Sequence, residues 1–174
     1  AYSSLGNLDR QFISTDLNVI IDNILIDFEL LIQDRNFKIK VGHLPVINGI
    51  PMQMNQLFYN LISNAIKFYK NDGSVPKIEI SSKKLTTKQV KTYTDLDAGL
   101  AYCEIVIKDN GIGFNQQYEN KIFTIFQRLH NNEVYIGTGI GLSIGKKIVE
   151  NHKGIIFSKA EENIGAEFHI ILPL

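Results

Sequence analysis

The chain has 174 residues, and 18 Lys and Arg balance 18 Asp and Glu, so its formal net charge is zero. Nucleic-acid binders and proteins that bind anionic membranes normally carry a basic excess, so this balance argues against both classes. Hydrophobic residues make up 44% and charged residues 21%, which is typical of a globular domain. The single cysteine excludes an internal disulfide and fits a reducing compartment, here expected to be the cytoplasm.

Hydrophobic spacing predicts the elements in chain order. Residues 1–15 show little periodicity and are interpreted as the tail of an upstream element and a linker, whereas residues 16–174 form one domain. Helical spacing starts at Asp16, a plausible N-cap, and runs to about Asp34. The other predicted elements are a helix that starts at Pro51 and ends before Asn71, strands over 37–41, 77–84, 102–108, 155–159 and 166–172, a loop over 110–138 and a helix over 141–152.

These helices and strands mix without regular βαβ alternation. That order favours helices layered on one mixed sheet, an α/β (α+β) two-layer sandwich. The strands over 77–84 and 102–108 are interpreted as a long hairpin, and the polar stretch 83–100 between them has no assigned role. No apolar run approaches the length of a membrane span, and the chain reads as a soluble piece of a longer protein.

One polar stripe lies opposite the apolar face of the helix that starts at Pro51. Its members fall within about 80° of one another on a helical wheel, and they are Gln56, Asn60, Asn64 and Lys67. A solvated helix face would explain them, but Asn is a mediocre helix former that Glu or Lys would outperform there. Amide oxygens are hard ligands that suit Mg²⁺, and Lys is a counter-charge for phosphate. The stripe therefore also fits a magnesium-bound polyphosphate.

A first glycine-rich segment, Asp109-Asn110-Gly111-Ile112-Gly113, follows a predicted strand. It is either an ordinary turn or a base-binding corner. In the second interpretation, the Asp109 carboxylate accepts a hydrogen bond from the exocyclic amine of adenine. Guanine has a hydrogen-bond acceptor at the same position, which the carboxylate would repel. Gly111 and Gly113 would then let a flat base approach the backbone.

A second glycine-rich segment, Gly137-Thr138-Gly139-Ile140-Gly141-Leu142, opens into the predicted helix over 141–152. Backbone N–H groups at a helix N-terminus bind phosphate oxygens, and a flexible hinge is the alternative. The P-loop pattern fails because no Ser or Thr follows Gly145-Lys146-Lys147. A dinucleotide-binding fingerprint stays open as the runner-up, although Ile144 replaces its third glycine.

The boxes follow one another in a fixed order: Asn60–Phe68, Asp109–Gly113, Phe123 with Phe126, and Gly137–Leu142. This succession closely resembles the N box, first glycine box, F box and second glycine box of sensor histidine kinases. Their superfamily also contains gyrase-type topoisomerases, large heat-shock chaperones and mismatch-repair ATPases. The segment Ile122–His130 resembles the phytochrome-type kinases in particular. The resemblance implies the Bergerat ATP-binding fold.

The resemblance also implies a site for ATP and Mg²⁺. It implies that Asn64 binds the metal, that Lys67 contacts a phosphate and that Asp109 binds the adenine amine. It also implies that residues 115–136 form a lid over ATP, in which Arg128 faces the γ-phosphate. The implied catalytic residues are Arg128 and Asn60, and the implied ATP-binding residues are Asn60, Asn64, Lys67, Asp109, Gly111, Gly113, Gly137, Thr138, Gly139, Gly141 and Leu142.

Asn60 separates branches of this superfamily. The hydrolysing branches have a water-activating Glu at that position, and an amide lacks the basicity for the role, so the resemblance implies phosphotransfer rather than fast hydrolysis. Implied partners are an upstream dimerisation and phosphoacceptor domain and a response regulator. The full-length protein would be a homodimer, and this chain a monomer that binds neither nucleic acid nor membrane. An anti-sigma-type serine kinase and a non-catalytic nucleotide-binding module remain alternatives.

None of the four histidines has the acidic, helical setting of a phosphoacceptor, so the chain alone is not expected to autophosphorylate. Two other positions depart from the family pattern. Ile50 stands where similar kinases usually have an Asp that starts the helix, which predicts a weaker cap. Asn163-Ile164-Gly165 stands where a Gly-x-Gly is usual, which predicts a slightly altered turn.

Overall fold

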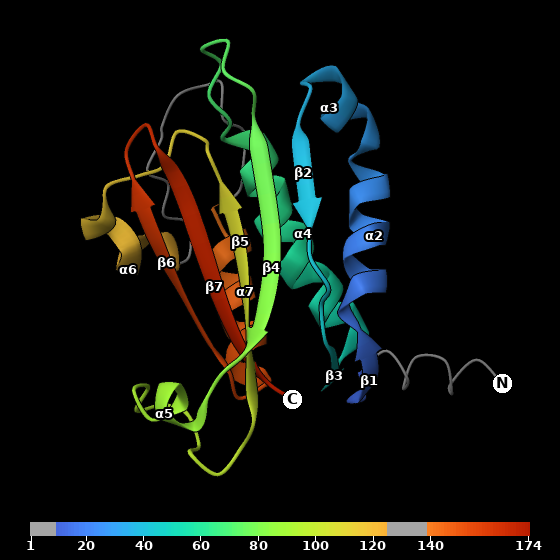
Figure 1. Ribbon diagram of the computed structural model, residues 1–174, viewed down its shortest axis with the longest axis vertical. Helices are drawn as coiled ribbons and strands as arrows, with labels where there is room; N and C mark the ends of the chain where they lie inside the picture. Colours follow the sequence, from blue (N-terminus) through green and yellow to red (C-terminus); the bar gives the residue numbers. More distant parts are fainter. Residues whose placement is uncertain (1–9, 125–138) are drawn as a thin grey trace, which may run out of the picture.

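The computed structural model describes residues 10–124 and 139–174 (Figure 1). Their elements are β1 (Ile13–Asp16), α2 (Leu17–Asp27), α3 (Glu29–Asp34), β2 (Lys38–Val41), β3 (Val46–Gly49), α4 (Pro51–Lys67), β4 (Lys77–Lys84), α5 (Thr87–Val90), β5 (Tyr102–Asp109), η1 (Gln116–Tyr118), α6 (Glu119–Ile122), α7 (Gly141–Asn151), β6 (Ile155–Glu161) and β7 (Gly165–Pro173).

Five strands form one mixed sheet in the order β2-β4-β5-β7-β6. Only the β2–β4 pair is parallel, and the β4–β5, β5–β7 and β7–β6 pairs are antiparallel. Helices α2, α4 and α7 lie on one face of this sheet, and the main core fills the space between the two layers (Figure 1). The predicted two-layer sandwich with helices on one face of a mixed sheet is confirmed.

Helix α4 lies between α2 and α7 and packs against both. Pro51 occupies its first turn, where the missing N–H costs nothing. Its buried face is the predicted one: Met54, Leu57, Phe58, Leu61, Ile62, Ala65 and Ile66. This packing fixes the direction of the opposite, polar stripe.

Three local predictions were wrong or incomplete. The helix expected over 16–34 is two helices, which meet at Phe28, where the buried ring turns to within 4.9 Å of the Tyr59 ring on α4. Residues 13–15, expected to be linker, form most of β1, which pairs with β3 in a separate two-stranded sheet. The loop expected over 110–138 contains the short helices η1 and α6 in its described part.

The stretch 83–100 covers one end of the outer face of the sheet, opposite the helices. It contains α5, whose N-terminus is closed by a Thr86–Gln89 capping box. Its apolar side chains bury a second, smaller core against the sheet, made of Leu85, Val90, Leu96, Tyr102 and Ile171. Figure 1 shows α5 at the end of the sheet where β4 leads into β5. The segment thus gives that end of the sheet a layer on both faces.

Candidate functional site

Asn60 joins the polar stripe of α4 to the second glycine segment. Its Nδ2 donates a hydrogen bond to the Gly141 carbonyl at 3.0 Å, where α7 begins. A Cβ on Gly141 would lie 3.5 Å from the Asn60 side chain, which is an ordinary van der Waals contact, so the bond itself does not depend on a glycine at this position. Two predicted site segments, 81 residues apart in the chain, are therefore in direct contact.

Asn64 and Lys67 lie one and two turns further along the same stripe of α4. Both side chains are half-buried, and the Lys67 ammonium lies 5.2 Å from the centre of the Phe68 ring. Gly139 and Leu142, beside the start of α7, are also half-buried, and Gly139 has a left-handed φ of 72°. Gly137, Thr138, Phe126 and Arg128 lie outside the described residues.

Asp109 ends β5 on the face that carries Ile105 and Ile107 into the core, which is the face of the helices. Its Oδ1 accepts a hydrogen bond from the Gly111 N–H at 2.8 Å. Burial raises the pKa of Asp109 to about 6, and the hydrogen bond from Gly111 opposes that rise. The carboxylate is thus held in place, ionised at neutral pH, with acceptor capacity left for a ligand.

The structure gives the glycines of the first segment a second purpose. A Cβ on Gly111 would lie 2.4 Å from the Phe68 carbonyl oxygen, and one on Gly113 would lie 2.1 Å from the Glu161 carbonyl oxygen. Backbone carbonyl groups of the protein therefore occupy the positions that side chains at Gly111 and Gly113 would need, so both glycines are required by packing even without a bound base. Two hydrogen bonds join the first glycine segment to the end of α4 and to the turn between β6 and β7. The Ile112 N–H donates to the Phe68 carbonyl at 2.9 Å, and the Asn163 N–H donates to the Ile112 carbonyl at 2.7 Å.

The turn between β6 and β7 contains Asn163, at the position where the resemblance predicts a glycine. Asn163 has a φ of 64°, in the left-handed region that Asn enters more readily than other side chains. Its carbonyl also accepts a hydrogen bond from Lys70 Nζ at 3.0 Å, which ties the turn to the end of α4. The turn thus accommodates Asn163 at a left-handed position.

Gln116 and Glu119 hold the described start of the predicted lid against the edge strand β6. Gln116 Oε1 accepts from the Ala160 N–H at 2.7 Å, and Gln116 Nε2 donates to the Ser158 carbonyl at 2.9 Å. Glu119 Oε1 accepts from the Ser158 N–H at 2.8 Å. These side chains replace the partners a neighbouring strand would supply. Sequence reasoning missed both residues, since single polar side chains in a loop carry no pattern.

Over residues 49–174 the chain matches the family described as "Histidine kinase-, DNA gyrase B-, and HSP90-like ATPase". It is 34% identical to the phytochrome-like protein Cph1 of Synechocystis over 173 residues, which are 99% of this chain and 21% of that protein. The chain belongs to this ATPase family.

Other relatives place it in the histidine kinase branch of the family. The sensor protein kinase WalK of Staphylococcus saprophyticus is 32% identical over 161 residues, which are 91% of this chain and 24% of that protein. The catalytic domain of histidine kinase ThkA matches with a TM-score of 0.71 and 25% identity over 94% of this chain and 97% of that one. ThkA has also been solved in complex with the response regulator protein TrrA. The chain is a histidine kinase-type ATPase catalytic domain, and it spans about a fifth of the phytochrome-like relatives.

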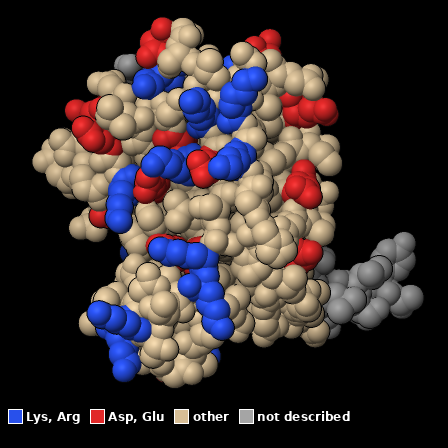
Figure 2. Space-filling model, viewed as in Figure 1, with Lys and Arg blue, Asp and Glu red and all other residues tan. Residues whose placement is uncertain are grey.

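The outer face of this ATPase domain carries a row of alternating charges (Figure 2). One cross-strand register places Lys40, Glu79, Lys108, Glu167 and Lys159 side by side across all five strands. Lys108 Nζ lies 2.6 Å from Glu167 Oε1, and this ion pair lowers the pKa of Glu167 and raises that of Lys108. Positive and negative charges therefore alternate from strand to strand along this row.

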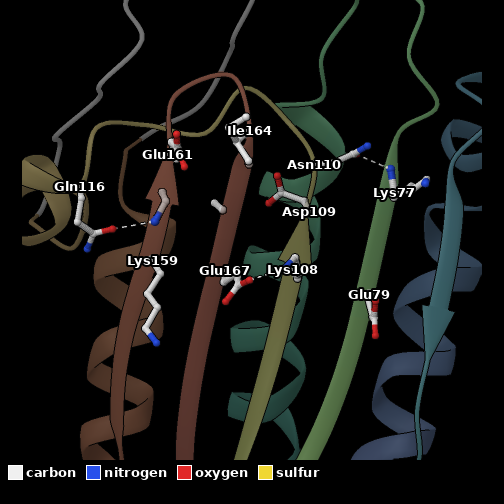
Figure 3. A pocket seen from close by; sticks show the side chains of 13 residues that line it. Lys77, Glu79, Lys108, Asp109, Asn110, Gln116, Lys159, Glu161, Ile164 and Glu167 are labelled. Atoms are coloured by element: carbon white, nitrogen blue, oxygen red, sulfur yellow. Dashed lines mark hydrogen bonds and ion pairs between the residues drawn. The ribbon is translucent and has the colours of Figure 1, made fainter.

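An open hollow of about 600 Å³ lies over this row, and Asp109 borders it at the end of β5 (Figure 3). Its other lining side chains include Lys77, Asn110 and Glu161. The hollow lies on the face opposite α4 and α7, so the stripe of Asn60 and Asn64 does not reach it. No described helix of this ATPase domain is long and apolar enough to cross a membrane.

Proposed function

We propose that the chain binds Mg-ATP between α4, α7 and the end of β5, and that it transfers the γ-phosphate to a histidine of a separate dimerisation domain. The Asn60–Gly141 hydrogen bond carries this proposal, because it joins the amide stripe to the glycine-rich start of α7. Family membership supports ATP as the nucleotide. A response regulator is the proposed acceptor downstream, and the cytoplasm, which supplies ATP, is the proposed compartment.

The described residues fit Mg²⁺ bound through the nucleotide. They contain no group of three or more His, Cys, Asp or Glu side chains that would hold a metal alone. A neutral amide such as Asn64 adds an oxygen ligand without repelling the phosphates, which complete the coordination. When bound, the metal would neutralise charge on the phosphate oxygens.

The residues of the chain would bind and orient the nucleotide. Asp109 would accept from the adenine amine, Lys67 would meet a phosphate, and N–H groups near Gly141 would bind phosphate oxygens at the start of α7. Asn60 holds the two helices together and lacks the basicity to activate water, so ATP would persist until an acceptor histidine arrives. The assignment of Arg128 to the γ-phosphate stays a prediction.

Calorimetric titration with ADP, GTP and NAD, each with and without Mg²⁺, tests the site. We expect ADP to bind and Mg²⁺ to strengthen it, whereas GTP and NAD should not bind. Asn64→Ala should abolish the strengthening by Mg²⁺, a loss of about tenfold in ADP affinity, and leave metal-free binding nearly unchanged. Gln56→Ala, on the same stripe one turn before Asn60, is the matched control and should keep the Mg²⁺ effect. Binding of NAD alone would favour the dinucleotide reading, and no binding at all would favour an interaction module.

Slow hydrolysis is the second expectation. Incubation with γ-labelled ATP should release phosphate at well below one turnover per second, because Asn60 offers no general base. The chain itself should gain no acid-labile label, since none of its histidines has an acceptor setting. Asn60→Glu is the informative variant, because a carboxylate there would be able to activate water. A rate near one per second for the unmodified chain would contradict the proposal.

A further inference from the structure

His152 lies at the end of α7 farthest from the site and joins that helix to α4. The imidazole is buried, with 4% of its surface exposed. Its Nε2 accepts a hydrogen bond from the Ile50 N–H at 3.0 Å, and its Nδ1 lies 2.8 Å from the Ile148 carbonyl oxygen, to which it donates. Burial lowers the pKa of His152, so the ring is neutral with its proton on Nδ1.

This contact satisfies a buried backbone group at the start of α4. Ile50 is the N-cap residue of α4, and its side chain makes no capping hydrogen bond. The Ile50 N–H would be buried without a partner if His152 were apolar, since Ile50 itself is only 5% exposed. The imidazole therefore gives the N-cap residue's own N–H a partner from another helix, although the missing side-chain cap of the first turn is not replaced.

The chain that leads into β1 also contacts this imidazole. The Phe12 ring lies 4.8 Å from the His152 ring, and 45% of Phe12 is exposed. One face of the imidazole is thus covered by a residue that is itself half in solvent. A change in the course of the chain around Phe12 would alter the packing of His152 directly.

The same pair of helices carries the site at its other end. Ile50 and Asn60 are ten residues apart on α4, which is about 15 Å along a helix. The Ile50–His152 bond, beside a hydrogen bond from Asn151 Nδ2 to Gln53 Oε1 at 2.9 Å, joins one end of the α4–α7 pair, and the Asn60–Gly141 bond joins the other. Because close-packed interiors transmit strain, we expect a displacement at the first bond to change the geometry at the second.

We infer that His152 is a positioning residue that sets the placement of α4 against α7 at the nucleotide site, and that Phe12 couples the incoming chain to it. The inference rests on the proposed function for its biological meaning. The mechanical coupling itself is a property of the nucleotide-free chain.

Two-dimensional NMR of the nucleotide-free chain, together with ADP calorimetry, tests the inference. His152→Phe keeps a ring beside Phe12 but removes both nitrogens, whereas His152→Gln keeps an acceptor and a donor. We expect His152→Phe to shift the Asn60 side-chain and Gly141 amide resonances and to weaken Mg-ADP binding about five- to tenfold. His152→Gln should restore affinity to within about twofold.

Phe12→Ala is the milder variant, which keeps the test valid if His152→Phe does not fold. It should shift the same two resonances, while Leu30→Ala, a change at an 82% exposed residue on α3, should not. Shifts confined to Gly49, Ile50 and Ile148 would show a purely local role and overturn the inference. A parent chain that binds no ADP would refute the proposed function instead, and the Asn60 and Gly141 resonances would still decide the coupling.

Discussion

Replacing Asp109 with Asn is expected to lower the affinity for Mg-ADP by about 10- to 100-fold. The carboxylate accepts from the adenine amine, and a hydrogen bond to a charged group contributes about 1.5–3 kcal/mol. Asn keeps an oxygen for the Gly111 N–H but presents an amide donor that adenine cannot pair with at that position. Calorimetry measures the loss. Asn110→Ala, which changes the neighbouring side chain that bonds the Lys77 N–H and the Val75 carbonyl, is the control.

The pH dependence separates Asp109 from other causes. Because burial raises its pKa to about 6, ADP affinity of the unmodified chain should fall as the pH falls through 6. The Asp109→Asn variant should lack this component, which leaves only the titration of the phosphates. The stability of the nucleotide-free chain should change the other way: a folded-state pKa above the ordinary 3.8 stabilises the fold at low pH, and that contribution is lost as the pH rises through 6. Parallel profiles for parent and variant would contradict the assignment.

Replacing Gly113 with Ala is expected to lower the free energy of unfolding by about 3 kcal/mol or more. The left-handed φ of 58° costs a side chain about 1–2 kcal/mol, and the new Cβ would lie 2.1 Å from the Glu161 carbonyl oxygen. Backbone would have to move, which adds to that cost. Chemical denaturation followed by circular dichroism measures the change.

Gly73→Ala is the matched control for this substitution. Gly73 also has a left-handed φ, of 84°, but a Cβ there would meet nothing within 4 Å. It should cost only the conformational strain, about 1–2 kcal/mol. If the two variants lost equal stability, the close contact between the first glycine segment and the β6–β7 turn would contribute nothing.

Long periodic elements were predictable from sequence because their burial repeats along the chain. The seven apolar positions of α4 all point into the core, and β4 has the predicted limits Lys77–Lys84. Asp16 also caps α2 as predicted, accepting from the Asn18 N–H at 2.8 Å. The polar stripe followed from the same periodicity, since a buried face fixes the opposite face.

Features built from distant segments were not predictable. β1 and β3 have four residues each, too few for a period, and each is stabilised by the other across 30 residues of chain. The contact of Asn60 with Gly141 depends on how α4 packs against α7, which no local pattern encodes. The bond of His152 to the Ile50 N–H was not predictable either, because the two residues lie 102 positions apart in the chain. Helix and strand patterns describe local burial, whereas these contacts arise from tertiary packing.

The second core under α5 has a consequence for how the sheet opens. At the Tyr102 end of β5 the strand is covered on both faces, by the main core and by the 83–100 segment. At the Asp109 end, helices cover only one face, and the open hollow lies on the other. Backbone amides near Tyr102 should therefore exchange with solvent only through global unfolding, whereas those near Asp109 open locally. The Tyr102 end of β5 should therefore be the rigid end of the sheet and the Asp109 end the more mobile one, and the proposed nucleotide site lies at the mobile end.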